Sequence, residues 1–529
     1  MATAAAPARR VPVATPTGPT DDVAHLPVEN SGLLIVGIMA ATLLQVLDTT
    51  IANVAIPHMQ STLGATPDTI TWVLTSYIIS SAVAMPITGW LADRIGSRRL
   101  FIASVGGFVA ASMLCGMAQN LTQMVLFRAL QGIGGAFIAP LSQAALLDTT
   151  RPSKQGQIIA LWGMGVMIGP ILGPILGGWI TENWSWRWCF YVNVPVGGLC
   201  LAIMIAQLPS RPVVKRRFDL LGFLLIALAL SGLQLFLDRG NQQDWFASHE
   251  IWIYAFVIAT STWMATIHFV SSPHALFDRS LFANANFVIA LIFMLVIGMV
   301  MFATMALLPP MLQGLFNYDV MGTGLALMPR GVGVLISMQL SAYVVRKGLD
   351  ARWMVSIGFL VGAYSLYQMS GWSLAADWYH IILSGFVQGL GIGMVFIPLQ
   401  GMAFATLPPR LRTDGSSLLN LTRNVGSSVG ISVMETLLVR NVQTSHSDLA
   451  SHITPAMINV IDLSTLDRFG QYGDVALRLV DAEVSRQAAM IAYVDDFWLM
   501  MWMSLASIPL ILIMRKSRGQ PVKAEPPAH

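Results

Sequence analysis

A single carboxylate inside the first long apolar segment constrains this chain more than any other feature. Asp48 lies in an apolar run that begins at Leu33 and ends near Ile56. A helix rises ~1.5 Å per residue, so Asp48 stands roughly 22 Å along a hydrocarbon layer of about 30 Å. Because a charged side chain is costly at that depth, we expect Asp48 to face a protein interior and to bind a proton, an ion or a substrate. The alternative is a structural carboxylate held by Asn53 or by a neighbouring helix.

The composition is that of a protein that crosses a membrane many times. Of the 529 residues, 55% are hydrophobic and 11% are charged, against about 25% charged residues in ordinary soluble domains. The basic residues are sorted by loop and form no nucleic-acid patch. Cys115, Cys189 and Cys200 lack the spacing of a metal or redox site, so we expect them to be packing residues and expect no bound metal or cofactor.

Apolar runs of about 20 residues predict fourteen helical spans in an all-α membrane fold. Six form a first block at 33–56, 70–92, 99–118, 122–147, 157–180 and 187–207. Two inserted spans follow at 219–237 and 249–271. A second block of six occupies 287–312, 323–345, 353–370, 378–405, 417–438 and 497–514.

These blocks define the expected domains. They are a tail at 1–32, an N-terminal six-helix bundle at 33–207, two additional spans with their linkers at 208–286, a C-terminal six-helix bundle at 287–514 and a second tail at 515–529. We interpret the N-terminal tail as disordered and not as a signal peptide, because it lacks a short apolar core with a cleavage site.

Lys and Arg gather in alternate connections, which predicts that those connections and both termini lie in the cytoplasm. The opposite short connections are nearly free of basic residues, with Arg239 as the main exception. The basic set in the connections is Arg94, Arg98, Arg99, Arg151, Lys154, Arg211, Lys215, Arg216, Arg217, Arg279, Arg346, Lys347, Arg352, Arg410 and Arg412.

The two blocks carry an internal repeat, as many transporters do. The fourth span contains Arg128, then Gln131 and Gly132, and the corresponding span of the second block contains Gly385, then Gln388 and Gly389. The second copy has thus lost the arginine. We therefore hypothesise that the first half handles protons and that the second half contributes mainly to the substrate wall.

A charged segment, residues 89–99, closes the second span. Its two glycines permit close approach and a tight turn, while its aspartate can pair with basic residues or cap a neighbouring helix. We expect it to hold one conformation of a rocking bundle; an ordinary charged hairpin is the alternative. The residues concerned are Gly89, Asp93, Arg94, Gly96, Arg98 and Arg99.

A run of glycines and prolines lies in the fifth span. Small residues four apart allow another helix to pack closely, and the prolines remove backbone hydrogen bonds. We favour a hinge or sliding face over a static packing motif. The residues concerned are Gly169, Pro170, Gly173, Pro174, Gly177 and Gly178.

Arg128 lies well inside the fourth span, so its permanent charge needs a carboxylate, carbonyl groups or water. Paired with Asp48, it would favour the ionised form of that side chain; a purely structural anchor is the alternative. Arg330 and Arg423 of the second half are further buried candidates, although Arg423 could also extend to the cytoplasmic face.

The long outer segment at 440–496 can be a flexible loop, or else a docking surface or lid. Met and aromatic residues suit a cavity for varied hydrophobic ligands. The candidates for the cavity wall are Met39, Asn53, Trp72, Tyr77, Gln131, Met164, Met167, Phe293, Phe302 and Arg423.

Four segments in order resemble signatures of the major facilitator superfamily and of its fourteen-helix drug:proton antiporter branch. They are residues 47–57, 89–99, 128–134 and 169–178. Residues 193–197, 237–240 and 244–246 and the long outer segment make the chain similar to the EmrB type of Gram-negative inner-membrane exporters. The resemblance implies two six-helix bundles around a central cavity, Asp48 as proton carrier and Arg128 in the relay. It also implies an EmrA-like periplasmic adaptor and a TolC-like outer-membrane channel as partners.

The function expected from this resemblance is antiport of protons against hydrophobic drugs or toxic compounds, with no enzymatic activity. No GxxxxGK[ST] loop for ATP is present. A membrane-embedded acyltransferase that uses His274 and Asp278, a proton-coupled importer, and an exporter of one metabolite, lipid or siderophore are the alternatives. The last of these is the strongest.

Overall fold

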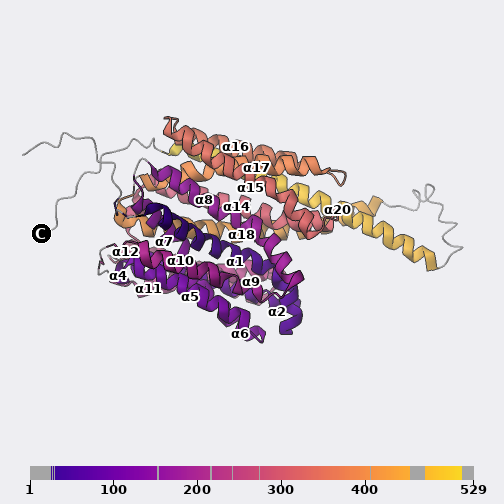
Figure 1. The fold of residues 1–529 in the computed structure, drawn as a ribbon. Coiled ribbons are helices and arrows are strands. Elements are labelled where there is room, and N and C mark those ends of the chain that lie inside the picture. The colour runs from indigo at the N-terminus through magenta and orange to yellow at the C-terminus, as the bar shows by residue number, and fades with distance from the viewer. Residues whose placement is uncertain are drawn as a thin grey trace, which may run out of the picture.

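A computed structural model describes residues 25–514, with gaps at positions 27, 29, 152–153, 212, 215–216, 241, 273, 406 and 453–470. Every element in this part of the chain is a helix, and the long helices run side by side along one axis (Figure 1). The predicted all-helical membrane fold is confirmed.

The helices of the first block and the inserted pair match the predicted spans. They are α1 (Ser31–Leu63), α3 (Trp72–Ala84) continued by α4 (Thr88–Ile95), α5 (Ser97–Met117), α6 (Leu121–Ala136) continued by α7 (Ile138–Thr149), α8 (Gln155–Asn183), α9 (Trp188–Tyr191) continued by α10 (Asn193–Gln207), α11 (Leu220–Gly240) and α12 (His249–Ser271). The short α2 (Pro67–Ile70) and α13 (Arg279–Ala283) lie in connections.

The second block has six long helices. They are α14 (Ala285–Gly314), α15 (Val320–Arg346), α16 (Ala351–Ser370), α17 (Trp378–Ala405), α18 (Arg412–His452) and α20 (Gln471–Ser507), which is continued by the 3₁₀ helix η6 (Ile508–Ile513). In the described part of the chain, 12 helical segments are long and apolar enough to cross a membrane. The predicted spans α16 and α18 are less apolar than these, and they run alongside the others (Figure 1).

Two predicted spans are interrupted where a proline removes a backbone donor. The 3₁₀ helix η1 (Met85–Ile87) separates α3 from α4 and contains Pro86. The break between α6 and α7 falls at Phe137, within one turn of Pro140.

Helices of each block pack mainly on one another. In the first block α1 packs on α8 and α10, and α6 packs on α3 and α5. In the second, α17 packs on α15 and α16, and α18 packs on α14 and α20. The inserted helices α11 and α12 pair, and α11 reaches α3 and α18. This pattern supports the proposed division into two bundles and an inserted pair, whose exact boundaries stay a prediction.

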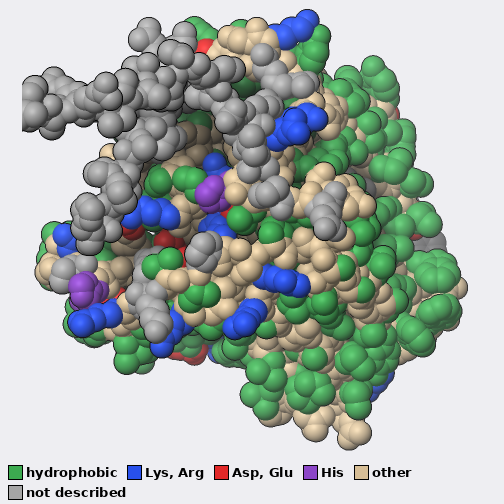
Figure 2. Space-filling view, turned by 60° about the vertical axis from the view of Figure 1, so that its left-hand side comes forward, with side chains coloured by type: hydrophobic (Ala, Val, Ile, Leu, Met, Phe, Trp, Pro, Cys, Tyr) green, Lys and Arg blue, Asp and Glu red, His purple; other side chains and the backbone are tan. Residues whose placement is uncertain are grey.

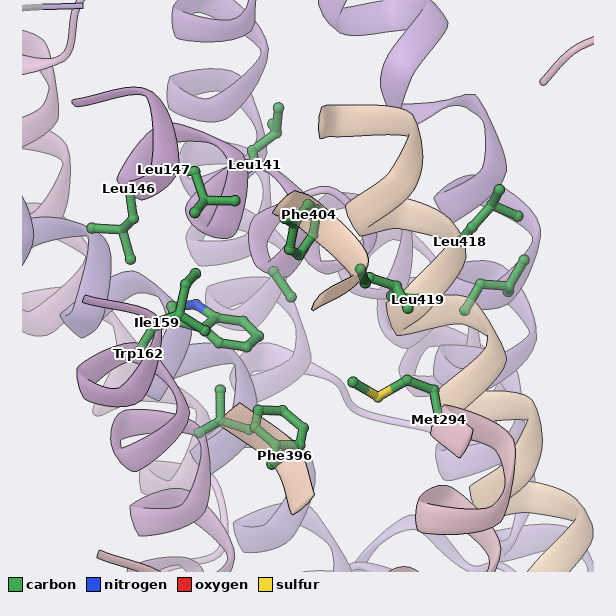
Figure 3. Packing of buried hydrophobic residues seen from close by; sticks show 14 of the residues in the cluster. Leu141, Leu146, Leu147, Ile159, Trp162, Met294, Phe396, Phe404, Leu418 and Leu419 are labelled. Atoms are coloured by element: carbon green, nitrogen blue, oxygen red, sulfur yellow. The ribbon is translucent and has the colours of Figure 1, made fainter. Parts of the chain in front are cut away.

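The hydrophobic core joins the two blocks. Trp162 of α8 is fully buried, and its ring stacks on that of Phe396 of α17 with 6.4 Å between centroids. Leu141 and Leu147 of α7 lie in the same cluster, with Leu419 of α18 across from them (Figure 3).

Basic side chains cover the end of the molecule where α1 begins. Figure 2 brings this end forward and shows several Lys and Arg side chains spread over it. Exposed members of the predicted cytoplasmic set are Arg94, Arg99, Arg217, Arg279 and Arg410. We call this the basic end.

The outer segment at 440–496 is mostly helical, which corrects the idea of a loop over that range. Helix α18 continues to His452 and α20 begins at Gln471, so the last span starts well before residue 497. His446 of α18 and Asp481 of α20 lie 3.1 Å apart and connect the two helices. Helix α20 extends beyond the rest of the bundle (Figure 1). The early start of α20 agrees with the many Ala, Leu, Arg and Glu residues of its first half, which favour a helix.

Candidate functional site

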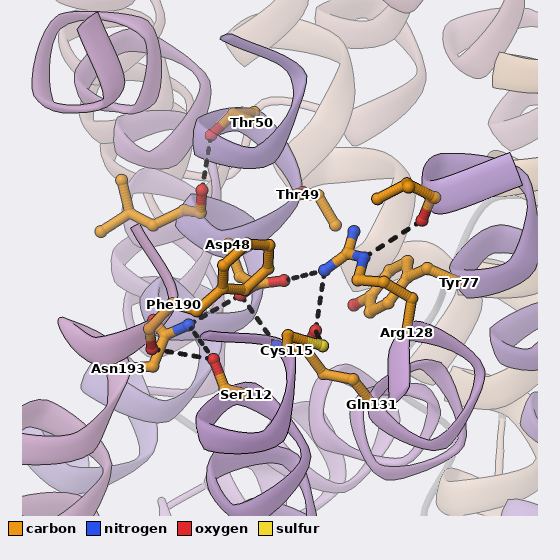
Figure 4. Close-up of polar contacts among 12 residues, drawn as sticks. Asp48, Thr49, Thr50, Tyr77, Ser112, Cys115, Arg128, Gln131, Phe190 and Asn193 are labelled. Atoms are coloured by element: carbon orange, nitrogen blue, oxygen red, sulfur yellow. Dashed lines mark hydrogen bonds and ion pairs between the residues drawn. The ribbon is translucent and has the colours of Figure 1, made fainter. Parts of the chain in front are cut away.

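The predicted pair of buried charges lies in one cluster. Asp48 of α1 is 1% exposed and Arg128 of α6 is fully buried. Arg128 Nη1 donates to Asp48 Oδ2 over 2.7 Å (Figure 4). The remaining carboxylate oxygen accepts from Gln131 Nε2 at 2.8 Å and from Asn193 Nδ2 at 2.7 Å. Both oxygens of Asp48 therefore accept hydrogen bonds, and one of these bonds comes from a charged guanidinium.

Further contacts fix the guanidinium of Arg128. Its Nε donates to the carbonyl of Val73 at 3.2 Å, and its Nη1 also donates to Gln131 Oε1 at 2.8 Å. The guanidinium carbon lies 4.4 Å from the ring centroid of Tyr77 and 5.7 Å from that of Phe190. Aromatic faces and carbonyl oxygens are the partners that a buried guanidinium prefers.

Asn193 belongs to this cluster, although we assigned it no role from the sequence. It begins α10, and its Nδ2 also donates to Ser112 Oγ of α5 at 2.9 Å. A polar side chain in an otherwise apolar segment was the available signal. Four helices thus contribute to holding one carboxylate: α1, α5, α6 and α10.

A central cavity of about 220 Å³ lies beside the cluster, between the two blocks. Tyr77 borders both, because its ring covers Arg128 and its side chain lines the cavity. The wall mixes polar and apolar groups. It includes Gln45, Thr49, Gln234, Asn424 and Ser427 among the polar residues, and Ile78, Val166, Leu233, Met301 and Phe302 among the apolar ones.

Three predicted cavity residues line this cavity, namely Tyr77, Phe302 and Arg423. Arg423 therefore points inward, and the alternative of a side chain extended to the cytoplasmic face is wrong. It is 9% exposed, and in the described part of the chain no carboxylate pairs with it.

Other predicted cavity residues lie elsewhere. Gln131 is part of the ion cluster, and Phe293 is buried in the core, where its ring centroid lies 5.4 Å from that of Phe359. Asn53 is exposed on α1, so it forms no hydrogen bond with Asp48 and does not line the cavity.

Met39, Met164 and Trp72 do not line this cavity either. Met39 packs beside Gly165, Met164 Sδ accepts from Gln339 Nε2 at 3.5 Å, and Trp72 is half-buried at the start of α3. The side chain of Met167 lies outside the described residues. Side-chain type alone predicted these positions, and type does not say which face of a helix points inward.

The glycine and proline run of α8 faces α1. A methyl group added at Gly169 would meet Val46 Cγ1 at 2.5 Å, and one at Gly173 would meet the Thr50 side chain. Gly177 approaches the backbone of Ile51, and Gly178 is also buried. Helix α8 continues through Pro170 and Pro174. The predicted close packing is therefore present, two or three residues from Asp48 along α1, and its role as a hinge stays a prediction.

The charged segment 89–99 lies at the basic end against the second block. A side chain at Gly89 would collide with the Asp414 carboxylate of α18, and Gly96 has a φ of 93° that favours glycine. Asp93 O accepts from Val214 N at 3.0 Å, and Arg98 Nη2 donates to Ile205 O at 2.5 Å. Arg94 and Arg99 are exposed.

Several polar contacts join helices at the basic end. The sequence did not predict them. Asp148 of α7, 1% exposed, forms ion pairs with Arg211 and, at 3.2 Å, with Arg412 of α18. Arg211 Nη1 also donates to Thr413 Oγ1 at 2.9 Å, and Ser417 Oγ donates to Met85 O at 2.6 Å. These contacts connect the two blocks at the basic end of the molecule.

The proposed enzymatic pair has a structural role instead. Asp278 Oδ1 accepts from Ser280 N at 2.9 Å and caps α13, while His274 is exposed. An ion cluster beside a cavity between two helical blocks is instead the arrangement of a membrane transporter.

Comparison with known proteins identifies the family. The family model described as Major Facilitator Superfamily matches residues 38–431, so the chain belongs to that superfamily of transporters. The chain is 33% identical over 499 residues to the Multidrug export protein EmrB of Escherichia coli (strain K12), covering 93% of this chain and 97% of that protein. It is 35% identical over 494 residues to the Fatty acid resistance protein FarB of Neisseria gonorrhoeae, covering 92% and 95%.

A solved structure supports the fold. The proton:xylose symporter XylE superposes with a TM-score of 0.61 at 12% identity, covering 92% of this chain and 96% of that one. At that identity the likeness concerns the fold alone. The resemblance to EmrB-type members of the superfamily, first seen in short motifs, therefore extends over nearly the whole chain.

Proposed function

We propose that this chain is a proton-driven antiporter that exports hydrophobic drugs or other toxic compounds across the bacterial inner membrane. The observation that carries the proposal is the buried pair of Asp48 and Arg128 beside the central cavity. A carboxylate that is ionised in one conformation and protonated in another is the element that proton coupling requires. The names of the EmrB relatives support export as the direction of transport.

In the proposed cycle Asp48 takes a proton from the periplasm, which weakens its ion pair with Arg128. The blocks then rock along the close packing of α1 and α8, the proton leaves to the cytoplasm, and the substrate moves outward in exchange. Each inward proton supplies ~2.3 kcal/mol per 100 mV, and one pH unit adds about 1.4 kcal/mol.

The proposal includes orientation and partners. The basic end faces the cytoplasm, which contains both termini, and the helical extension of α18 and α20 lies in the periplasm. There it meets an EmrA-like adaptor that leads to a TolC-like outer-membrane channel. The extension beyond the bundle supports a docking role over that of a flexible loop.

The test of this function is proton release from acidified inside-out vesicles that contain the protein. Ethidium, rhodamine 6G and other hydrophobic drugs are added in turn, and the internal pH is followed by fluorescence. We expect at least one drug to evoke release that is absent from vesicles without the protein. If no drug of the panel evoked proton release, although folded protein was present in the membrane, multidrug antiport would be contradicted.

A second candidate function, export of one amphipathic acid such as a fatty acid, rests on Arg423. Its guanidinium lines the cavity, is 9% exposed and has no carboxylate partner among the described residues. An unpaired buried cation favours an anionic group at that point of the cavity. The similarity to FarB, whose name refers to fatty acid resistance, agrees with this chemistry.

Replacing Arg423 tests the candidate with two ligands of equal chain length, laurate and dodecyltrimethylammonium. We expect Arg423→Gln to weaken laurate binding by about tenfold to hundredfold, the value of one charge-assisted hydrogen bond, and to leave the cation unaffected. Binding is measured by tryptophan fluorescence of purified protein. Arg330→Gln is the matched control, because Arg330 is also a buried arginine, at 7% exposure, but does not itself line the cavity; it donates to the backbone carbonyl of Met301 at 3.1 Å. Equal weakening of both ligands would contradict an anion site.

A further inference from the structure

Helix α20 contains a buried carboxylate that the Asp48 cluster does not involve. Asp496 is 1% exposed, the same fraction as Asp48. Both of its carboxylate oxygens are buried and neither has a hydrogen-bond partner. In the described part of the chain it is the only carboxylate of which this is true. Asp48, by contrast, accepts three hydrogen bonds from three side chains.

The surroundings of Asp496 are apolar. The adjacent Phe497 is fully buried and packs on Trp372 with 5.9 Å between ring centroids. Met500, one turn further along α20, is also fully buried. An ionised carboxylate without a partner in such a place costs several kcal/mol, whereas a protonated one costs far less. The neutral acid is therefore the form that this conformation accommodates.

Within the described residues, neither oxygen of Asp496 has a hydrogen bond to a cationic side chain. Helix α20 packs on α14, α16 and α18. Helix α14 has no ionisable residue, and the ion pair between Asp350 and Arg352 lies at the opposite end of α16.

The groups near Asp496 on α18 and on α20 itself are acidic or neutral. They are Asp495 and Tyr493 of α20, and Glu435 of α18 interacts with Tyr493 in turn. The nearest arginine along α20, Arg486, donates to Leu315 O at 3.2 Å instead. The charges around Asp496 thus disfavour a second negative charge.

The internal repeat allows the surroundings of Asp48 in the first block to be compared with the corresponding residues of the second block. Gln131 of the first copy bonds Asp48, and Gln388 of the second copy donates to Thr304 Oγ1 at 3.3 Å. The Thr304 hydroxyl in turn contacts Met500 Sδ at 3.6 Å, one turn from Asp496. The second block therefore has a neutral threonine where the first has Asp48, and its buried carboxylate lies on the last helix.

The two carboxylates also lie at similar depth. Counted from Ser31, Asp48 is roughly 26 Å along α1. Counted back from Met514 through η6 and α20, Asp496 is roughly 28 Å from the same basic end. A proton carried across the membrane has to pass a similar distance at either position.

We propose that Asp496 is a second proton-binding residue of the transport cycle, protonated in the conformation in which Asp48 is ionised. This proposal rests on the proposed proton antiport and changes its stoichiometry from one proton to two. In each cycle Asp496 releases its proton to the cytoplasm and takes another from the periplasm, returning to the neutral acid. The hypothesis that only the first half handles protons would then be wrong.

The test measures the substrate gradient that a pH gradient sustains in proteoliposomes, with the membrane potential held at zero by valinomycin and potassium. The substrate is the drug of the panel above that evokes the largest proton release. For two protons the gradient changes by about hundredfold per pH unit, and for one proton by about tenfold. We expect about hundredfold for the native protein and about tenfold for Asp496→Asn.

Two control variants separate charge from structure. Asp495→Asn removes the exposed neighbour and should keep the hundredfold dependence. Asp496→Glu retains a carboxylic acid and should also retain the hundredfold dependence. A tenfold dependence in the native protein that Asp496→Asn leaves unchanged would overturn the proposal for Asp496 alone. If the substrate gradient of the native protein did not depend on the pH gradient, proton antiport itself would be refuted.

A spectroscopic measurement detects the protonated carboxyl group of Asp496 without a transport assay. The infrared spectrum of the native protein should contain the carbonyl stretching band of a protonated carboxylic acid. We expect Asp496→Asn to lack the band and Asp496→Glu to shift it, so that the glutamate variant decides the matter if the asparagine variant does not fold. A native protein without such a band would overturn the proposal.

Discussion

Replacing Asp48 with asparagine should abolish transport driven by a pH gradient while leaving drug-for-drug exchange across the membrane. Asparagine cannot be protonated, so the ion pair with Arg128 no longer forms and breaks in each cycle, and without that change the rocking of the blocks is not coupled to the proton on Asp496 either. The asparagine amide also cannot accept all three hydrogen bonds that Asp48 receives from Arg128, Gln131 and Asn193. We expect drug-evoked proton release from vesicles to fall to background, and counterflow of labelled drug to persist.

The same variant should be less stable, because it leaves Arg128 as a buried charge without a partner. Breaking a buried ion pair in this way costs about 3–5 kcal/mol, whereas replacing both partners is often neutral. The double variant Asp48→Asn with Arg128→Met should therefore recover thermal stability in detergent but not proton coupling. Recovered coupling in the double variant would assign Asp48 a structural role only.

The sequence predicted the part of this site that depends on the cost of burying charge. Asp48 and Arg128 were identifiable because a charge inside a long apolar segment needs a partner, and the structure brings the two to 2.7 Å. The glycines of α8 were identifiable by their spacing. The helical spans were predictable for the same reason, since hydrocarbon requires continuous runs of about 20 apolar residues.

The sequence did not predict contacts between segments far apart in the chain. Asn193 looks like any polar residue near a helix end, and Asp148 like any residue of a connection, until the fold places each against its partners. The cavity wall was also poorly predicted. Met and aromatic residues face lipid, core and cavity alike, and the polar Gln45 and Asn424 line the cavity without a distinctive pattern. Asp496 was counted only as the end of an outer segment, because the helix that buries it begins much earlier than apolarity indicates.

Removing the Asp148 carboxylate should open the basic end of the molecule. Asp148 is the one acidic partner of both Arg211 and Arg412 among the described residues, and the second of these pairs joins the two blocks. In Asp148→Asn the two guanidinium groups face each other without compensation, which disfavours the closed conformation. A loss of about 1.4 kcal/mol changes the ratio of open to closed molecules tenfold.

The change in conformation can be followed at Ala144, which is 3% exposed at this end. With the three native cysteines replaced, Ala144→Cys should react with a membrane-impermeant maleimide about tenfold faster in the Asp148→Asn background. Asp350→Asn is the matched control, because Asp350 also pairs with an arginine, Arg352, at 2.7 Å, and both residues belong to the second block. Equal labelling in both backgrounds would mean that packing around Trp162 and Phe396, and not the ion pairs, keeps this end closed.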